Sequence, residues 1–175
     1  PLFHSILALR ARRGKEDKTR LNERKGISGI DRPDGFLFWI HAASVGESQS
    51  ALILMKKLLA IKPESHILIT TGTVSSQKFI SNRLPQRCFH QFYPLDHPKW
   101  IKRFLNHWKP DMALWIESEL WPNMMDEIGA RKIPAILINA RMSAQSYKKW
   151  KIFKKDVCTL LKTFVLILAQ TERYR

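Results

Sequence analysis

Cysteine is scarce in this sequence, and long apolar runs are absent from it. Cys88 and Cys158 are the only two cysteines, and they form neither a CxxC pair nor a zinc-ligand spacing, which argues against a disulfide scaffold and a zinc module. We expect both to be buried thiols in a reducing compartment. Because no run of about 18 apolar residues occurs, we expect no segment to span a bilayer. No secretory signal is recognisable.

Acidic residues are few in relation to basic ones. The chain has 15 Asp and Glu against 30 Lys and Arg, which gives a formal net charge of +15. Such a charge predicts an anionic partner, which could be nucleic acid, a phosphorylated substrate or a membrane surface. The length of 175 residues and the 45% hydrophobic content are typical of one globular α/β domain.

Several common functional motifs are missing. There is no GxGxxG after the first expected strand and no GxxxxGK[ST], so a classical dinucleotide or P-loop site is not predicted. No GxSxG elbow supports a hydrolase. Candidate metal ligands are scattered, so we predict no metal cofactor, and no reading helix or aromatic RNA-binding motif favours nucleic acid.

What the sequence does contain is an alternation of short apolar runs and helical patterns from Phe36 onward. Expected strands cover 36–41, 66–71, 87–93, 112–117, 135–140 and 165–170. Expected helices cover 49–61, 97–108, 122–131 and 144–162, and a further one begins near Ser75 or Ser76 and ends at Arg83. This alternation predicts an α/β fold, a Rossmann-like parallel sheet with helices on both faces, over residues 36–175.

Residues 1–35 differ in character from the rest. Apolar residues at helical spacing are followed by a basic run, and a connector rich in glycine covers 26–35. The basic amphipathic segment suits an anionic membrane surface. A solvated basic helix packed on its own domain is the equal alternative. Both ends of the chain resemble cuts in something larger.

Polar residues follow the expected strands where each one ends. In an open parallel sheet, ligands bind outside these carboxyl ends. The residues concerned are Ser44, Gly46, Glu47, Thr70, Thr71, Thr73, Asp96, His97, Glu117, Glu119, Asn139, Arg141 and Ser143. Polar loops are common, so this convergence supports a site without identifying it.

Specific sequence blocks resemble a known family. They are residues 39–47 (WIHAASVGE), 70–73 (TTGT), 93–96 (YPLD), 117–123 (ESELWPN) and 139–143 (NARMS), with 13–16 (RGKE) and 23–24 (ER) upstream. In order and over essentially the whole chain, they are similar to the 3-deoxy-D-manno-octulosonic acid (Kdo) transferases. Gly72 and Val74 depart from the family's usual pattern in the threonine-rich loop.

The resemblance implies the N-terminal, acceptor-binding half of a glycosyltransferase of the GT-B type. Such an enzyme would transfer Kdo from CMP-Kdo to a lipid A precursor with inversion, at the cytoplasmic face of the bacterial inner membrane. It would be peripheral there or anchored by a segment upstream of residue 1. The donor-binding half would follow Arg175, so the isolated chain should be inactive. The alternative is a basic non-enzymatic module that binds anionic membrane or nucleic acid.

The resemblance also implies residue roles. Glu47 would be the general base, and Glu117 an acid that aids the transition state. The implied substrate-binding residues are Ser44, Gly46, Thr71, Glu119 and Arg141. Structural alternatives remain open: an acid in a first helical turn is a common dipole partner, and Glu117 and Arg141 could form an ordinary ion pair.

Overall fold

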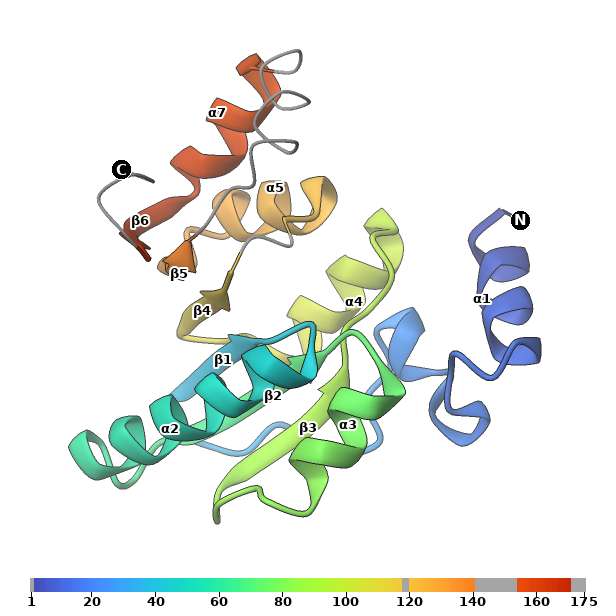
Figure 1. Cartoon of the computed structure of the whole chain (residues 1–175). Coiled ribbons are helices and arrows are strands. Elements are labelled where there is room, and N and C mark those ends of the chain that lie inside the picture. The colour runs from blue at the N-terminus through green and yellow to red at the C-terminus, as the bar shows by residue number, and fades with distance from the viewer. Residues whose placement is uncertain (1, 118–119, 141–153, 171–175) are drawn as a thin grey trace.

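The computed structural model describes residues 2–117, 120–140 and 154–170, and a six-stranded sheet forms its centre (Figure 1). Every strand pair is parallel, and the strand order is β3-β2-β1-β4-β5-β6. The strands are β1 (Leu37–His41), β2 (His66–Thr71), β3 (Cys88–Phe92), β4 (Met112–Ile116), β5 (Ala135–Ala140) and β6 (Phe164–Ala169). The predicted Rossmann-like parallel sheet is confirmed.

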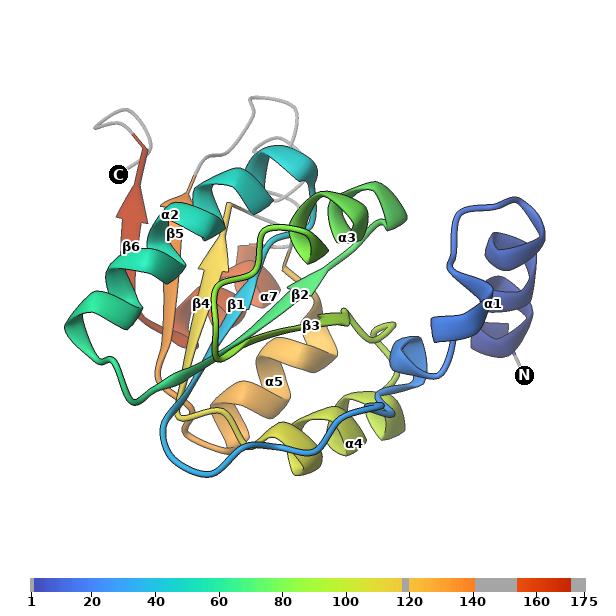
Figure 2. The ribbon, with the colours of Figure 1, turned by 90° about the horizontal axis from the view of Figure 1, so that it is seen from below.

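Helices cover both faces of this sheet (Figure 2). The helices along the chain are α1 (Leu2–Arg12), the short η1 (Lys18–Arg20) and η2 (Glu23–Lys25), α2 (Val45–Ile61), α3 (Val74–Ser81), α4 (Pro98–Trp108), α5 (Pro122–Ala130) and α7 (Lys154–Lys162). Helices α2 and α3 pack on one face, through the core that includes Met55 and Ile80. Helices α4, α5 and α7 pack on the other, through the core that includes Phe104 and Ile128.

Strand β1 shows why its sequence is apolar without interruption. Alternate side chains point to opposite faces of a sheet, and Phe38 and Ile40 belong to the α2 side while Leu37 and Trp39 belong to the α4 side. Both faces are covered, so every residue of the strand is buried. The Trp39 ring lies 5.0 Å from the Phe104 ring, and such an aromatic contact adds about 1 kcal/mol to the burial of its area.

Two helices begin earlier than the periodicity predicted. Helix α2 begins at Val45 rather than at residue 49, and α3 at Val74 rather than after Ser75 or Ser76. In each case a hydroxyl at the preceding residue accepts a hydrogen bond from the first turn: Ser44 accepts from the Glu47 N–H and Thr73 from the Ser76 N–H. The caps, and not the apolar stripe, set these boundaries.

The two cysteines differ in exposure. Cys88 is buried in β3 as predicted, and burial raises the pKa of its thiol to about 12. Cys158 is exposed, so the prediction that it is buried was wrong. It lies on α7, and Leu160 and Leu161 of the same helix are the residues that pack against the core.

The segment before β1 packs against the side of the sheet. Phe3 of α1 makes edge-to-face ring contacts with His97 and Trp100 at 5.1 and 6.0 Å, and Leu7 is buried. Helix α1 therefore rests on the start of α4, while Ile6 and Leu9 stay exposed. Within the described residues, no helix is long and apolar enough to cross a bilayer. The division of the chain at residue 35 stays a prediction.

Candidate active site

The ends of β1 and β4 mark the topological switch point of the sheet. The two strands are neighbours, with His41 beside Trp115. The chain leaves β1 toward α2 on one face and leaves β4 toward α5 on the other. Open α/β sheets bind ligands where the connections diverge in this way. Glu47 follows β1 and Glu117 follows β4, so the two predicted catalytic acids lie on connections that start from this point.

The turn from β1 into α2 is a variant of the capping box, in which Glu47 reaches back to the residue before the N-cap Ser44. The Ser44 hydroxyl accepts from the Glu47 N–H at 3.3 Å and donates to Glu47 Oε1 at 2.7 Å. Glu47 Oε2 accepts from the Ala43 N–H at 2.7 Å. The spacing Ser44-x-x-Glu47 is the sequence signature of this arrangement, and it would have placed the start of α2 correctly.

Both oxygens of the Glu47 carboxylate are therefore engaged, but neither is saturated. An ionised carboxylate has about four acceptor positions, and the two bonds use one on each oxygen. The residue is 9% exposed. The two hydrogen bonds hold the carboxylate in one orientation.

Ser44 and Gly46 lie at the exposed surface of the same turn. A Cβ built on Gly46 would meet no atom within 4 Å. The surface above Gly46 is open to an approaching molecule, and the predicted substrate contacts of Ser44 and Gly46 stay predictions.

The loop after β2 and the first turn of α3 hydrogen-bond to the Glu47 turn. The Gly72 N–H donates to the Ala43 carbonyl at 3.3 Å, and the Ser76 hydroxyl donates to the same carbonyl at 3.2 Å. A Cβ on Gly72 would lie 3.2 Å from the Ala43 carbonyl oxygen, closer than nine in ten real Cβ contacts. The departure from the family pattern at this residue thus coincides with a close approach of two backbones.

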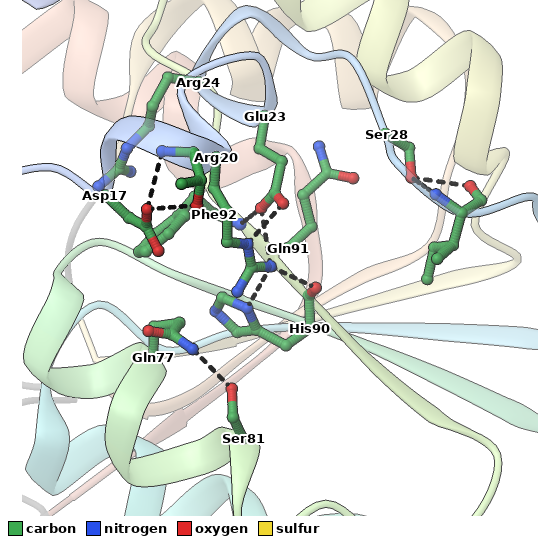
Figure 3. Close-up of polar contacts among 12 residues, drawn as sticks. Asp17, Arg20, Glu23, Arg24, Ser28, Gln77, Ser81, His90, Gln91 and Phe92 are labelled. Atoms are coloured by element: carbon green, nitrogen blue, oxygen red, sulfur yellow. Dashed lines mark hydrogen bonds and ion pairs between the residues drawn. The ribbon is translucent and has the colours of Figure 1, made fainter.

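Thr71 points into the protein. It is fully buried, and its hydroxyl lies 2.9 Å from His90 Nε2. Arg20 Nη2 lies 3.0 Å from His90 Nδ1 and donates to the His90 carbonyl at 3.0 Å (Figure 3). Because a guanidinium only donates, Nδ1 accepts and the ring proton sits on Nε2, directed at Thr71. The substrate contact predicted for Thr71 stays a prediction; in this structure its hydroxyl is bonded to His90.

The His90 ring is neutral in this setting. Burial, and then the nearby charges of Arg20 and Arg24, lower the pKa of His90 to about 3. Glu23 completes the cluster, since it accepts from Arg20 Nε at 2.7 Å and from the Phe92 N–H at 2.7 Å. The short helices η1 and η2 are thereby fixed to the carboxyl end of β3.

A buried ion pair was missed by the sequence analysis. Arg24 is 2% exposed and Glu16 is 5% exposed. Arg24 Nε donates to Glu16 Oε2 at 2.7 Å, and its two terminal nitrogens donate to the Tyr93 and Gly72 carbonyls at 2.8 and 2.6 Å. In the sequence these residues belong to a basic run typical of a solvated surface. The isolated acids within that run are the signal that could have indicated partners.

Glu117 ends β4 in an unusual backbone conformation. Its φ is 63°, in the left-handed region, and its N–H donates to the Ile138 carbonyl at 2.9 Å. This conformation costs free energy for a residue other than glycine, and such residues cluster at functional sites. The residue is partly exposed. Glu119 and Arg141 lie outside the described residues, so their predicted roles stay predictions.

Asp96 has a structural role at the same edge. Its carboxylate accepts from the Asn123 and Met124 N–H groups at 3.1 and 3.0 Å, so it caps α5 from the loop before α4. Among the described residues, no group of three or more His, Cys, Asp or Glu could hold a metal ion.

Comparisons with known proteins all point to one family. The model of the family described as 3-deoxy-D-manno-octulosonic-acid transferase (kdotransferase) matches residues 14–175. A 3-deoxy-D-manno-octulosonic acid transferase of Rickettsia bellii is 42% identical over 173 residues, which is 99% of this chain and 41% of that protein. A probable mitochondrial one of Arabidopsis thaliana is 43% identical over 95% of this chain and 38% of its own length.

A more distant relative agrees with these two. The transferase of the same name from Haemophilus influenzae is 34% identical over 97% of this chain and 40% of its own length. The chain thus spans about two-fifths of the length of these curated relatives.

Proposed function

This chain belongs to the 3-deoxy-D-manno-octulosonic acid (Kdo) transferase family, and we propose that it is the acceptor-binding half of an enzyme that transfers Kdo from CMP-Kdo to a lipid A precursor. The observation that carries the proposal is the placement of Glu47 and Glu117 after the neighbouring strands β1 and β4, at the switch point of the sheet.

In the proposed reaction, a hydroxyl of the acceptor attacks the anomeric carbon of Kdo. The new carbon–oxygen bond forms on the face opposite the bond to the CMP phosphate, which breaks, so the configuration inverts and CMP leaves. The hydroxyl proton passes to Glu47. The two hydrogen bonds from Ala43 and Ser44 hold the carboxylate in one orientation, and it accepts the proton late, when negative charge has built up on the attacking oxygen.

The other predicted site residues would interact with charges on the two substrates. Glu117 would stabilise an anomeric centre that becomes positive in the transition state. Arg141 would bind an acceptor phosphate through its planar guanidinium, with Glu119 beside it. Ser44, Gly46 and Thr71 would shape the wall against which the acceptor lies. The donor would bind to a second domain, and the chemistry requires no metal.

The N-terminal segment would bring the enzyme to an anionic membrane, in keeping with an acceptor that is a lipid. Ile6 and Leu9 of α1 are 39% and 48% exposed, and the exposed Arg12 and Arg13 follow them. Apolar side chains beside cations suit the boundary of anionic headgroups. We place the enzyme at the cytoplasmic face of the bacterial inner membrane, where it would be peripheral or anchored by a segment upstream of residue 1.

The test of the reaction is a transfer assay on the full-length protein. The substrates are CMP-Kdo and a tetraacyl lipid A precursor, and the product is detected by its mass. We expect Kdo to be added to the precursor, and we expect this chain alone to give no product because it spans only about two-fifths of the length of its curated relatives. A full-length protein that is folded and inactive with this pair, but active with another nucleotide sugar, would refute the substrate assignment.

The membrane proposal has a separate test. The full-length protein is sedimented with vesicles of neutral and anionic lipid, and I6S/L9S is compared with I61S, which changes an isoleucine at the end of α2 that is 82% exposed. We expect I6S/L9S alone to weaken binding. Binding that disappears at moderate salt and is unaffected by I6S/L9S would instead indicate charge alone, without insertion of α1.

A further inference from the structure

The contacts of Arg24 join three separate loops at the edge of the sheet. Its terminal nitrogens donate to the carbonyl of Gly72 after β2 and to that of Tyr93 after β3. Its own carbonyl accepts from the Leu95 N–H at 3.0 Å. Glu16 accepts from Arg24 Nε and from Arg10 Nε. The guanidinium carbon lies 4.7 Å from the centre of the Phe92 ring, so the group is confined on one side by the aromatic face.

From this pair, a continuous path of hydrogen bonds leads to the candidate base. Arg24 holds the carbonyl of Gly72, and the N–H of Gly72 donates to the carbonyl of Ala43. The N–H of Ala43 in turn donates to the Glu47 carboxylate at 2.7 Å. The backbones of Gly72 and Ala43 approach closely here, since a Cβ on Gly72 would lie 3.2 Å from the Ala43 oxygen, so we expect a shift of the Gly72 loop to be transmitted to the Glu47 turn.

We propose that the buried ion pair of Glu16 and Arg24 positions the Glu47 carboxylate for proton transfer, by fixing the loop on which the Glu47 turn rests. This inference rests on the proposed function of Glu47 as the base. Arg24 is a positioning residue, because it contacts backbone carbonyls and not the reacting atoms. A buried ion pair alone adds little net stability, whereas the placement of a reacting group is sensitive to shifts of about 1 Å.

The control is Arg32, which also bonds backbone carbonyls and an acid but at the opposite end of the strands, with its side chain 24% exposed against 3% for Arg24. Arg32 donates to the carbonyls of Trp108 and Gly35 and to the Asp111 carboxylate. Asp111 in turn accepts from the Leu37 N–H, where β1 begins. Arg32→Lys therefore removes the same kind of anchor without touching the edge that carries Glu47.

The experiment compares R24K, R32K and the double variant E16L/R24M in the full-length protein. The double variant replaces both charges by apolar groups, which preserves packing where a single change would strand a buried charge. The measurements are the midpoint of thermal unfolding, kcat and KM, and hydrogen exchange of the Ala43, Glu47 and Gly72 amides.

We expect R24K and E16L/R24M to lower kcat by about ten- to a hundredfold with a small change in KM. Exchange of the three amides should become faster in both. R32K should lose less thermal stability, because its ion pair is more exposed, and it should retain its kcat and the protection of these amides.

Two results would overturn the inference. One is unchanged exchange of the Ala43 and Glu47 amides in R24K and E16L/R24M. The other is a loss of kcat in R32K that equals the loss in R24K. Failure of the proposed function is seen separately, as the absence of transfer by the wild-type protein. In that case the exchange measurement still decides whether the pair holds the turn.

Discussion

The N–H of Ala43 donates a 2.7 Å hydrogen bond to the carboxylate of Glu47, four residues further along the chain. This bond and the one from the Ser44 hydroxyl fix the carboxylate at the first turn of α2. The same contacts that cap a helix therefore also orient an acid at the switch point of the sheet. The two roles can be separated by substitution. The turn needs only a side-chain group at residue 47 that makes these hydrogen bonds, whereas the proposed proton transfer needs a carboxylate.

Gly26 should be one of the least replaceable residues of the N-terminal segment. Its φ is 73°, and an added Cβ would lie 2.1 Å from the Trp100 carbonyl oxygen. We expect Gly26→Ala to lower the free energy of unfolding by about 3 kcal/mol or more, since both strain and a backbone clash result. Chemical denaturation measures this.

The control for Gly26→Ala is Gly14→Ala. Gly14 has a φ of 68° but no atom within 4 Å of an added Cβ, so only the conformational cost of about 1 kcal/mol applies. Equal losses in the two variants would show that Gly26 does not lie against the Trp100 carbonyl of α4.

Asp96→Ala should destabilise α5. The variant leaves the N–H groups of Asn123 and Met124 without their acceptor, which costs about 1–2 kcal/mol. The matched control is Asp126→Ala, which removes an exposed acid of the same helix and should change stability by no more than about 0.5 kcal/mol. If denaturant unfolding finds the two variants equal, Asp96 does not cap α5.

His90 should make the protein less stable in mild acid. Its pKa is about 3 in the folded state against an ordinary value of 6.5, so between these pH values the unfolded state binds the additional proton. The stability due to neutral His90 is complete above about pH 6.5 and is lost as the pH falls, with a slope of up to about 1.4 kcal/mol per pH unit.

His90→Gln tests this dependence. The amide can still accept from Arg20 or donate to Thr71, but it does not titrate. We expect the free energy of unfolding of the wild type to fall by about 1–2 kcal/mol more than that of the variant between pH 6.5 and 5. If the free energies of unfolding of wild type and variant fall in parallel over this range, the pKa of His90 is not lowered in the folded protein.

Glu117→Gly should separate stability from activity. The left-handed φ of 63° at Glu117 favours glycine, so we expect stability to be retained or to rise by up to about 1 kcal/mol. Transfer should fall about tenfold or more, because the acid is lost. Lys132→Gly is the control: Lys132 is exposed and has a φ of 55°, so the same relief of strain should leave kcat unchanged. A fully active Glu117→Gly would remove Glu117 from the mechanism.

The sheet was predictable because its strands are apolar on both faces. The runs at 66–71 and 135–140 match β2 and β5 to the residue. The helix starts were less accurate, since hydrophobic periodicity does not detect a cap. The Ser44-x-x-Glu47 spacing contained that information, and the start of α2 could have been predicted from it.

The ion pair of Glu16 and Arg24 was beyond local sequence rules. Arginines in a basic run are nearly always solvated, and the carbonyls that make burial of Arg24 acceptable come from Gly72 and Tyr93. Those partners lie some 50 to 70 residues away in the chain. Tertiary packing, and not the composition of the segment, determined whether these charges are buried.

The most direct test of the central claim is the kcat of Glu47→Gln in the full-length protein with CMP-Kdo and a tetraacyl lipid A precursor. Glutamine can accept from the Ala43 N–H and donate to the Ser44 hydroxyl, so the turn should stay folded and the unfolding free energy should change by about 1 kcal/mol or less. We predict that transfer falls by about a thousandfold or more. A Glu47→Gln enzyme with a kcat near that of the wild type would contradict the assignment of Glu47 as the base.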